Sequence, residues 1–87
     1  MIKRNVTLKN ETGLHARPAS ELVKLSNKFK SNIEIAVGDK KASAKSILGI
    51  MSLGIKANTE IEIICDGEDE QTAMNEIIEA FNNNFGE

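Results

Sequence analysis

The stretch Thr59-Glu60-Ile61-Glu62-Ile63-Ile64-Cys65 has the clearest strand pattern in the chain. Ile61, Ile63 and Cys65 occupy alternate positions, which is typical of a strand with one face toward a core. If this strand inserts between the first and second strands of the chain, every pair of neighbouring strands is antiparallel. In that arrangement residues 59–65 would lie at the centre of an antiparallel sheet.

A turn and a helix are predicted after this strand. Asp66-Gly67 is a turn signal. Glu68 or Asp69 can begin the helix, since acidic side chains complement the N-terminal end of the helix dipole. Apolar residues then recur at helical spacing, and the predicted buried stripe consists of Ala73, Met74, Ile77, Ile78, Phe81 and Phe85. We expect the helix to fray over residues 82–84.

Three further strands are predicted before this one. Residues 2–8 and 32–37 alternate between apolar and polar side chains. Gly38-Asp39 is a two-residue hairpin signal, and it predicts a short strand over residues 40–44. Lysines in this short strand suit an exposed edge of the sheet.

Two more segments are predicted to be helical. From Pro18 to about Asn27 or Lys28, apolar residues recur at spacings of three and four. Residues 47–53 predict a helix of one or two turns, with Ser46 as its N-cap.

These elements predict an α+β fold with the order βαββαβα. Four amphipathic strands need one covered face, and helices packed on that face supply the cover. We expect a single domain over residues 1–87, in which the long helices cover one face of a four-stranded sheet. Ile50 and Leu53 are predicted to join the core.

The composition argues against several functions. The net charge is −2, from 11 basic and 13 acidic residues, and the only aromatic residues are three Phe, so we expect no nucleic-acid binding. The N-terminus has no apolar signal core, and no stretch approaches the ~18 apolar residues of a membrane span. Cys65 is the only cysteine, which suits a reducing compartment. We therefore expect a cytoplasmic protein without a membrane partner.

Residues 12–20, Thr-Gly-Leu-His-Ala-Arg-Pro-Ala-Ser, contain the main candidate for a chemical site. His15 is the only histidine, and it lies where a loop enters a predicted helix. The first N–H groups of a helix lack intrahelical partners and carry partial positive charge, so phosphate binds there readily. Arg17 adds a full charge and a planar fork of donors. These features favour a site that receives a phosphoryl group, although a lone histidine is more often a surface or packing residue.

Two motifs resemble the HPr family, the phosphocarriers of the bacterial sugar phosphotransferase system. Residues 13–19, Gly-Leu-His-Ala-Arg-Pro-Ala, are similar to the active-site signature of the family. Residues 45–54, Lys-Ser-Ile-Leu-Gly-Ile-Met-Ser-Leu-Gly, resemble its regulatory serine region. The resemblance covers essentially the whole chain. It implies the open-faced β-sandwich of the family, a four-stranded antiparallel sheet with three helices on one face.

The resemblance also implies roles for the residues around His15. His15 would accept a phosphoryl group on Nδ1 from enzyme I, which obtains it from phosphoenolpyruvate, and would pass it to sugar-specific EIIA components. The backbone N–H groups of Ala16 and Arg17 would hold the phosphate oxygens, and the Arg17 side chain would stabilise charge during transfer. The protein would be a substrate of transferases rather than an enzyme. The chain has no glycine-rich nucleotide loop, and we expect no cofactor and no metal.

Ser46 has two interpretations. As an N-cap it would stabilise the short helix by about 0.5–2 kcal/mol relative to alanine. The resemblance adds phosphorylation by an HPr kinase/phosphorylase, which would weaken the exchange with enzyme I and promote binding to a catabolite-control transcription factor. A two-turn helix cannot bury apolar side chains all round, so we predict a docking patch of Ile47, Leu48 and Met51.

Three alternatives remain open at this point. A regulatory or nitrogen-branch relative of the family would share the fold, but a signalling-only relative would be expected to lack the histidine. A small phosphohydrolase using His15 and Arg17 would release inorganic phosphate without an acceptor protein. An RNA-binding α/β module is disfavoured by the acidic charge and by the absence of Tyr and Trp.

Overall fold

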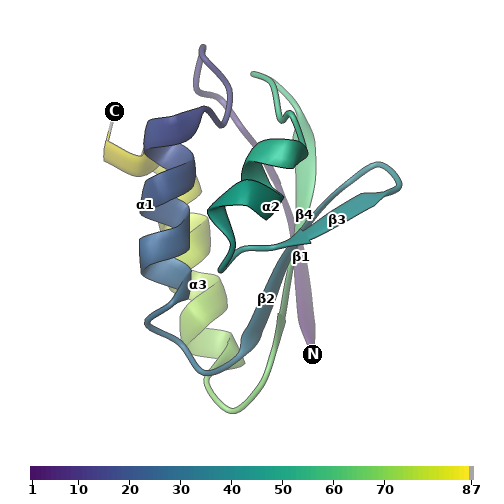
Figure 1. Cartoon of the computed structure of the whole chain (residues 1–87). Coiled ribbons are helices and arrows are strands. Elements are labelled where there is room, and N and C mark those ends of the chain that lie inside the picture. The colour runs from purple at the N-terminus through teal and green to yellow at the C-terminus, as the bar shows by residue number, and fades with distance from the viewer. Residues whose placement is uncertain (87) are drawn as a thin grey trace.

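The computed structural model describes residues 1–86, and its helices and strands follow the order predicted from the sequence (Figure 1). Their bounds are β1 (Ile2–Thr7), α1 (Ala16–Ser26), β2 (Asn32–Val37), β3 (Lys40–Ser43), α2 (Ile47–Ser52), β4 (Glu60–Asp66) and α3 (Glu70–Asn82), followed by a 3₁₀ turn, η1 (Asn84–Gly86).

The sheet has the strand order β1-β4-β2-β3, and each neighbouring pair is antiparallel. Ile63 of β4 lies opposite Arg4 of β1 on one side and Ile35 of β2 on the other. The predicted insertion of residues 59–65 between the first two strands is therefore confirmed. β3 is an edge strand, and its residues Lys40 and Lys41 are exposed, as predicted.

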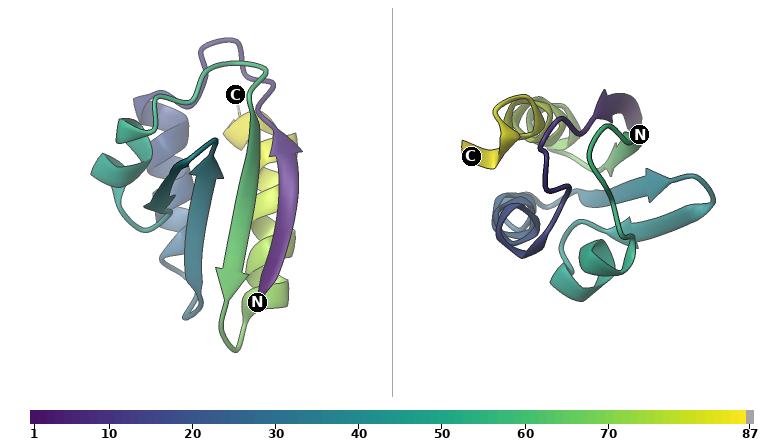
Figure 2. Two further views of the ribbon diagram at one scale, coloured as in Figure 1. Left: turned by 90° about the vertical axis from the view of Figure 1, so that its right-hand side faces the viewer. Right: turned by 90° about the horizontal axis from the view of Figure 1, so that it is seen from above.

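The helices cover one face of this sheet, and the core lies between the two layers. Figure 2 shows the sheet with α1 and α3 behind it. Alternate residues of the two central strands, Ile33, Ile35, Ile61, Ile63 and Cys65, are at most 1% exposed. Burial raises the pKa of the Cys65 thiol to about 11, so this cysteine stays protonated and acts as a core side chain. The buried residues of the helices are mainly Leu22, Ile50, Ala73, Met74, Ile77 and Phe81.

The end of α3 differs from the prediction at Phe85. The expected stripe continued along the helix to Phe85, but α3 ends at Asn82. Asn84 and Phe85 then adopt positive φ angles of 51° and 54°, which turn the chain back. The Phe85 ring packs edge-on against Phe81 at a centroid distance of 4.8 Å and remains half-buried. Phe85 therefore contacts the core through a reversal of the chain and not as part of the helix.

Asp69 lies at the start of α3, where a helix beginning was predicted, but its carboxylate does not cap the helix. It accepts hydrogen bonds from the backbone N–H groups of Lys30 and Ser31, at 2.9 and 3.0 Å, and from the Ser31 hydroxyl. These donors lower the pKa of Asp69 to about 2, with the Ser31 hydroxyl as the main cause. The carboxylate thus ties the start of α3 to the loop that precedes β2.

None of the helices described in residues 1–86 is both long enough and apolar enough to span a membrane.

Candidate functional site

The segment that carries His15 begins with a tight turn held by Asn10. The Asn10 side-chain oxygen, Oδ1, accepts from the Thr12 backbone N–H at 3.1 Å and from the Thr12 hydroxyl at 2.9 Å. The Gly13 N–H donates to the Asn10 carbonyl oxygen at 3.0 Å. An asparagine side chain that bonds the backbone two residues later forms an Asx-turn, which fixes the local chain direction. Asn10 is only 8% exposed, so these bonds are largely shielded from water.

The turn is pressed against the segment that follows α2. Gly13 has a φ of +71°, and a Cβ at this position would lie 2.6 Å from the carbonyl oxygen of Ile55. The Leu14 N–H donates to that same oxygen at 3.0 Å, and the Leu14 side chain is buried. Only glycine combines this backbone angle with this close approach. The packing therefore fixes the residues on which His15 is mounted.

His15 is the N-cap residue of α1, with an extended backbone at φ −79° and ψ −169°. The helix begins at Ala16, so Pro18 lies in its first turn, as predicted, but at the third helical position. The His15 ring nitrogen Nδ1 lies 3.0 Å from Thr12 Oγ1 and 3.4 Å from the Gly13 carbonyl oxygen. The side chain is exposed. The imidazole is thus held over the start of a helix while a second protein can still reach it.

The first turn of α1 leaves two backbone donors beside this imidazole. Pro18 has no N–H, and the Ala19 N–H already donates to the His15 carbonyl oxygen at 3.0 Å. The N–H groups of Ala16 and Arg17 are therefore the ones that the turn presents to an anion. The exposed Arg17 side chain adds a guanidinium to the same end of the helix. The assignment of Ala16 and Arg17 as phosphate-binding residues stays a prediction from the sequence.

Ser46 lies at the N-terminus of α2, as predicted. Its hydroxyl accepts from the Gly49 N–H at 3.1 Å, and the residue is exposed. The prediction that Ser46 caps this helix is therefore confirmed. An exposed hydroxyl at this position is also accessible to a modifying enzyme.

The apolar residues of α2 divide into a buried and an exposed set. Ile50 is fully buried and Leu53 is 7% exposed, as predicted. Ile47, Leu48 and Met51 are 42%, 81% and 41% exposed, so large apolar side chains face solvent on this helix. Apolar surface that a fold leaves uncovered often marks a protein contact. The exposure of these three residues is observed, and their role as a docking patch stays a prediction.

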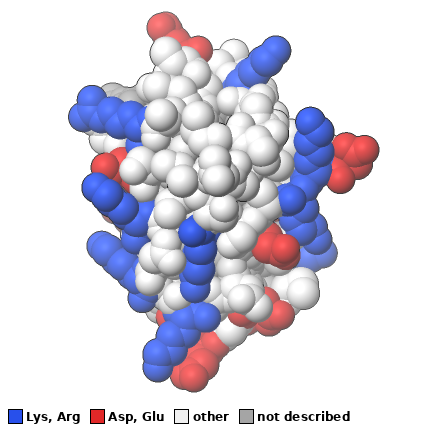
Figure 3. Space-filling model, viewed as in Figure 1, with Lys and Arg blue, Asp and Glu red and all other residues white. Residues whose placement is uncertain are grey.

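The surface around α2 is uncharged at its centre and has basic side chains on both sides (Figure 3). α2 lies beside α1 (Figure 1). Figure 3, which views the same face, shows uncharged residues over its centre, with Lys and Arg side chains on both sides. A surface of this kind fits a partner with an apolar centre and acidic groups around it.

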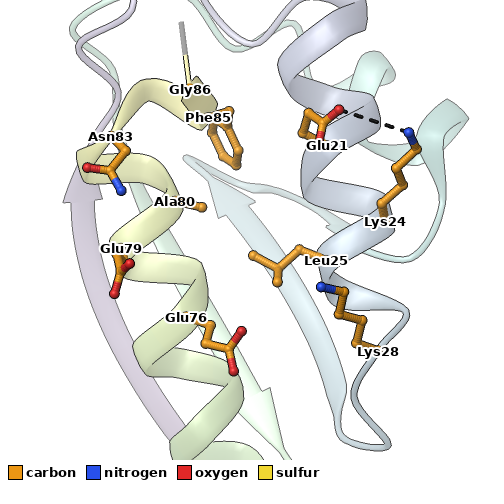
Figure 4. A pocket seen from close by; sticks show the side chains of 10 residues that line it. All are labelled: Glu21, Lys24, Leu25, Lys28, Glu76, Glu79, Ala80, Asn83, Phe85 and Gly86. Atoms are coloured by element: carbon orange, nitrogen blue, oxygen red, sulfur yellow. Dashed lines mark ion pairs between the residues drawn. The ribbon is translucent and has the colours of Figure 1, made fainter.

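A separate pocket lies between α1 and α3 and contains none of the predicted site residues. Its volume is about 500 Å³, and Leu25, Ala80 and Phe85 form its apolar part. Figure 4 shows charged side chains around the opening, including Glu21 and Lys24, which form an ion pair at 4.0 Å. None of the described residues that line the pocket is a histidine, so we do not assign the phosphoryl chemistry to it.

The sequence did not identify the residues that hold the His15 loop in place. Asn10, Thr12 and Ile55 hold the loop in place, yet they were not identified as site residues. The spacing of Asn10 and Thr12 is a signal for an Asx-turn. No local pattern identifies Ile55, because it meets the loop only through the tertiary fold. Within residues 1–86, no group of three or more His, Cys, Asp or Glu residues forms a candidate metal site.

Comparisons with known proteins agree on one family. The family described as "PTS HPr component phosphorylation site" matches residues 2–83. The phosphocarrier protein HPr of Xylella fastidiosa (strain Temecula1 / ATCC 700964) is 41% identical over 87 residues, which cover 100% of this chain and 98% of that protein. The HPr-like protein Crh of Bacillus subtilis (strain 168) is 42% identical over 77 residues, which cover 88% of this chain and 91% of that protein.

A solved structure shares the fold over the whole length. The crystal structure of HPr from Thermoanaerobacter tengcongensis superposes with a TM-score of 0.96 at 40% identity. The match covers 100% of this chain and 98% of that one.

Proposed function

This chain belongs to the HPr family of phosphocarrier proteins, and we propose that it carries a phosphoryl group on His15 between two proteins of the phosphotransferase system. Enzyme I donates the group, and sugar-specific EIIA components receive it. The chain acts as one carrier domain and as a substrate of transferases. It needs neither a cofactor nor a metal for this role, and it works in the cytoplasm.

The position of His15 is the observation that carries this proposal. An exposed imidazole stands at the N-cap of α1, beside the N–H groups of Ala16 and Arg17. Neutral imidazole is a good nucleophile near pH 7. The helix N-terminus and the Arg17 guanidinium stabilise the negative charge of the group that arrives. A phosphorylated imidazole also leaves readily, so the same site can release its cargo.

The surface of α2 supports the choice of protein partners over a small substrate. The docking patch of Ile47, Leu48 and Met51 is exposed, and basic side chains flank the uncharged area around it (Figure 3). We assign this patch to contacts with enzyme I and with the EIIA components. Met51 can adapt its conformation to more than one partner.

Ser46 is proposed as the regulatory site. A phosphate on its hydroxyl would sit at the N-terminus of α2, at the edge of the docking patch. An HPr kinase/phosphorylase would add it. The added charge would weaken docking of enzyme I and create a surface for a catabolite-control transcription factor.

Incubation with phosphoenolpyruvate and enzyme I, followed by intact-mass measurement, tests the proposal. We expect one added phosphoryl group that is lost in acid, as a phosphorus–nitrogen bond is. An EIIA component should then remove it. Absence of the group with active enzyme I, or an acid-stable product, would contradict the proposal. Release of inorganic phosphate without any EIIA would instead indicate a phosphohydrolase.

A regulatory relative is the second candidate, because the HPr-like protein Crh of Bacillus subtilis matches 88% of this chain. Such a protein would use Ser46 and would not exchange phosphoryl groups with enzyme I. His15 and the donors around it favour the carrier. Phosphorylation by the kinase without any acceptance from enzyme I would favour the regulatory relative.

A further inference from the structure

The chain has four sulfur-containing residues, three Met and one Cys, and they differ sharply in exposure. Met74 is 1% exposed and Cys65 is fully buried, with the pKa of its thiol raised to about 11. Met1 is 68% exposed, and Met51 on α2 is 41% exposed. Oxidation of sulfur side chains requires access to the oxidant, and for cysteine it also requires the thiolate. The thioethers of Met1 and Met51 are therefore the sulfurs that a dissolved oxidant can reach.

Met51 lies in the docking patch, whereas Met1 does not. Met51 follows Ile47 by four residues and Leu48 by three, and side chains at these spacings are neighbours on a helix surface. Its thioether is thus next to both of the other apolar side chains of the patch. Met1 lies beside the start of α3, where its amino group contacts the Glu70 carboxylate at 3.2 Å. A change at the Met51 sulfur would therefore alter the docking patch directly.

α2 is anchored to the core by residues other than Met51. Ile50 and Leu53 are at most 7% exposed, and they supply the buried apolar side chains of this segment. The carbonyl oxygen of Met51 accepts from the Gly54 N–H at 3.2 Å, so the backbone of this residue helps to end the helix. An oxygen added to the thioether should therefore change the surface of α2 while the helix persists.

We propose that Met51 is a reversible oxidation site and that its sulfoxide weakens the docking of protein partners on α2. This inference rests on the proposed function, because it takes the patch to contact enzyme I. Oxidation turns a flexible apolar side chain into a polar one. The added oxygen loses its hydration when a partner covers the patch, and burial of an unpaired polar group opposes binding. The sulfoxide has no net charge, so its effect differs in kind from that of a phosphate on Ser46.

The oxidant is a hydroperoxide, and the step balances without a further reactant. The sulfur lone pair attacks the terminal peroxide oxygen, and the sulfur–oxygen bond forms as the oxygen–oxygen bond breaks. The proton of the transferred oxygen passes to the leaving oxygen, which departs as water or as an alcohol. Sulfur loses two electrons and the peroxide gains them. Methionine sulfoxide reductases reverse the change, with one enzyme for each sulfoxide epimer.

The first test locates the modification by peptide mapping after treatment of the protein with hydrogen peroxide. Met1 and Met51 should each gain one oxygen, and Met74 and Cys65 should gain none. Thermal unfolding of the treated protein should show that the fold persists. A Met51 that stays unmodified while Met1 is oxidised would overturn the proposal.

The second test measures the exchange with enzyme I. Peroxide is removed before enzyme I is added, so that enzyme I itself is not oxidised. The apparent KM of enzyme I for the treated parent should be about five- to 150-fold higher than for the untreated parent, which is the range for burying one unpaired polar group. Met51→Leu is the matched control, because it retains Met1 and Met74. Treatment should leave its KM equal to that of its own untreated sample. No rise in the parent, or an equal rise in the variant, would overturn the proposal.

A polar substitution and enzymatic reduction provide a check that does not depend on the specificity of peroxide. Met51→Gln carries a neutral polar group, so its KM should exceed that of Met51→Leu without any treatment. Both reductases together with a thiol should return the KM of the treated parent to the untreated value. A KM that stays high after the sulfoxide has been removed would overturn the proposal.

Direct binding separates this inference from the proposed function. Enzyme I is titrated into treated and untreated protein by calorimetry, in the absence of phosphoenolpyruvate. Weaker binding of the treated protein, with no phosphoryl acceptance by either sample, would contradict the carrier function and support the oxidation site. Acceptance by both samples with equal binding would support the carrier function and overturn the oxidation site. If enzyme I does not bind the untreated protein, both proposals fail.

Discussion

The backbone N–H of Leu14 donates to the carbonyl oxygen of Ile55 at 3.0 Å, which ties the residue before His15 to the segment that follows α2. Gly13 packs on the same carbonyl group. The loop that carries the proposed phosphoryl acceptor is therefore fixed against the segment that follows α2. Changes at this contact should alter the geometry of His15 without touching its ring.

Gly13→Ala should destabilise the protein and slow phosphoryl acceptance. The added Cβ would lie 2.6 Å from the Ile55 oxygen, and the positive φ of +71° is itself strained for alanine. Strain of this kind costs on the order of 1–3 kcal/mol. Gly54→Ala is the matched control, since Gly54 also has a positive φ of +60° but no atom within 4 Å of the new Cβ. Denaturant unfolding should show the larger loss for Gly13→Ala, and equal losses would mean that the close approach has no cost.

His15→Ala should abolish phosphoryl acceptance and leave the fold intact. The imidazole is exposed, and its ring makes no capping bond to the helix. Intact-mass measurement after incubation with phosphoenolpyruvate and enzyme I should show a phosphoryl group on the parent alone. A phosphorylated alanine variant would place the acceptor elsewhere.

Arg17→Ala should slow the transfer without preventing it. The backbone donors of the first turn remain, but one charged group is lost from the transition state, and a loss of this kind typically costs about 10²–10³ in rate. Arg17→Lys should restore only part of the rate, because a point charge lacks the planar fork. Rapid-quench kinetics with phosphorylated enzyme I would measure both. A parent-like rate for the alanine variant would show that Arg17 takes no part in the chemistry.

Asp69→Ala should reduce stability in a manner that depends on pH. The hydrogen bonds from Ser31 and Lys30 lower the pKa of Asp69 to about 2 in the folded protein, against about 3.9 for an unfolded aspartate. A lowered folded pKa gives stability that is fully present above the unfolded value and is lost as the pH falls through the folded value. The difference in unfolding free energy between parent and variant should therefore shrink as the pH falls from about 4 toward about 2. A difference that stays constant over that range would contradict the assignment.

Much of the fold could be predicted because its signals are local. The alternation over residues 59–65 and the glycine turns required no tertiary information. The central position of β4 agrees with the fold that the family resemblance implies. The bond between Asp69 and Ser31 could not be predicted, since it joins residues 38 apart in the chain. Phe85 was placed on the helix because it continues the apolar spacing, which gives no sign of the positive φ angles that reverse the chain.

The candidate site was predictable in part for the same reason. His15, Ala16 and Arg17 lie together in one motif at a helix start, and Ser46 precedes a short apolar run, so their chemistry could be proposed from the sequence. The hydrogen bonds that orient the imidazole could not be predicted from the sequence. They depend on the turn that brings Thr12 Oγ1 to within 3.0 Å of Nδ1.

A negative charge at Ser46 should inhibit transfer from enzyme I without unfolding the protein. Ser46 is exposed and caps α2, where an anion is stabilised by about 0.3–1 kcal/mol. The next two residues, Ile47 and Leu48, belong to the exposed docking patch. When enzyme I covers this edge of the patch, the added charge would lose its hydration or be repelled by the partner surface. Either effect weakens binding.

Ser46→Asp and Ser46→Ala, compared with the parent, separate docking from stability. Aspartate should raise the apparent KM of enzyme I for this protein, and alanine should not. Aspartate can still accept from the Gly49 N–H, whereas alanine loses that bond and about 0.5–2 kcal/mol with it. The aspartate variant should therefore melt no lower than the alanine variant. If aspartate leaves the KM unchanged, Ser46 is only a helix cap. If it lowers the melting temperature sharply, the lost transfer reflects damage to α2 and not blocked docking.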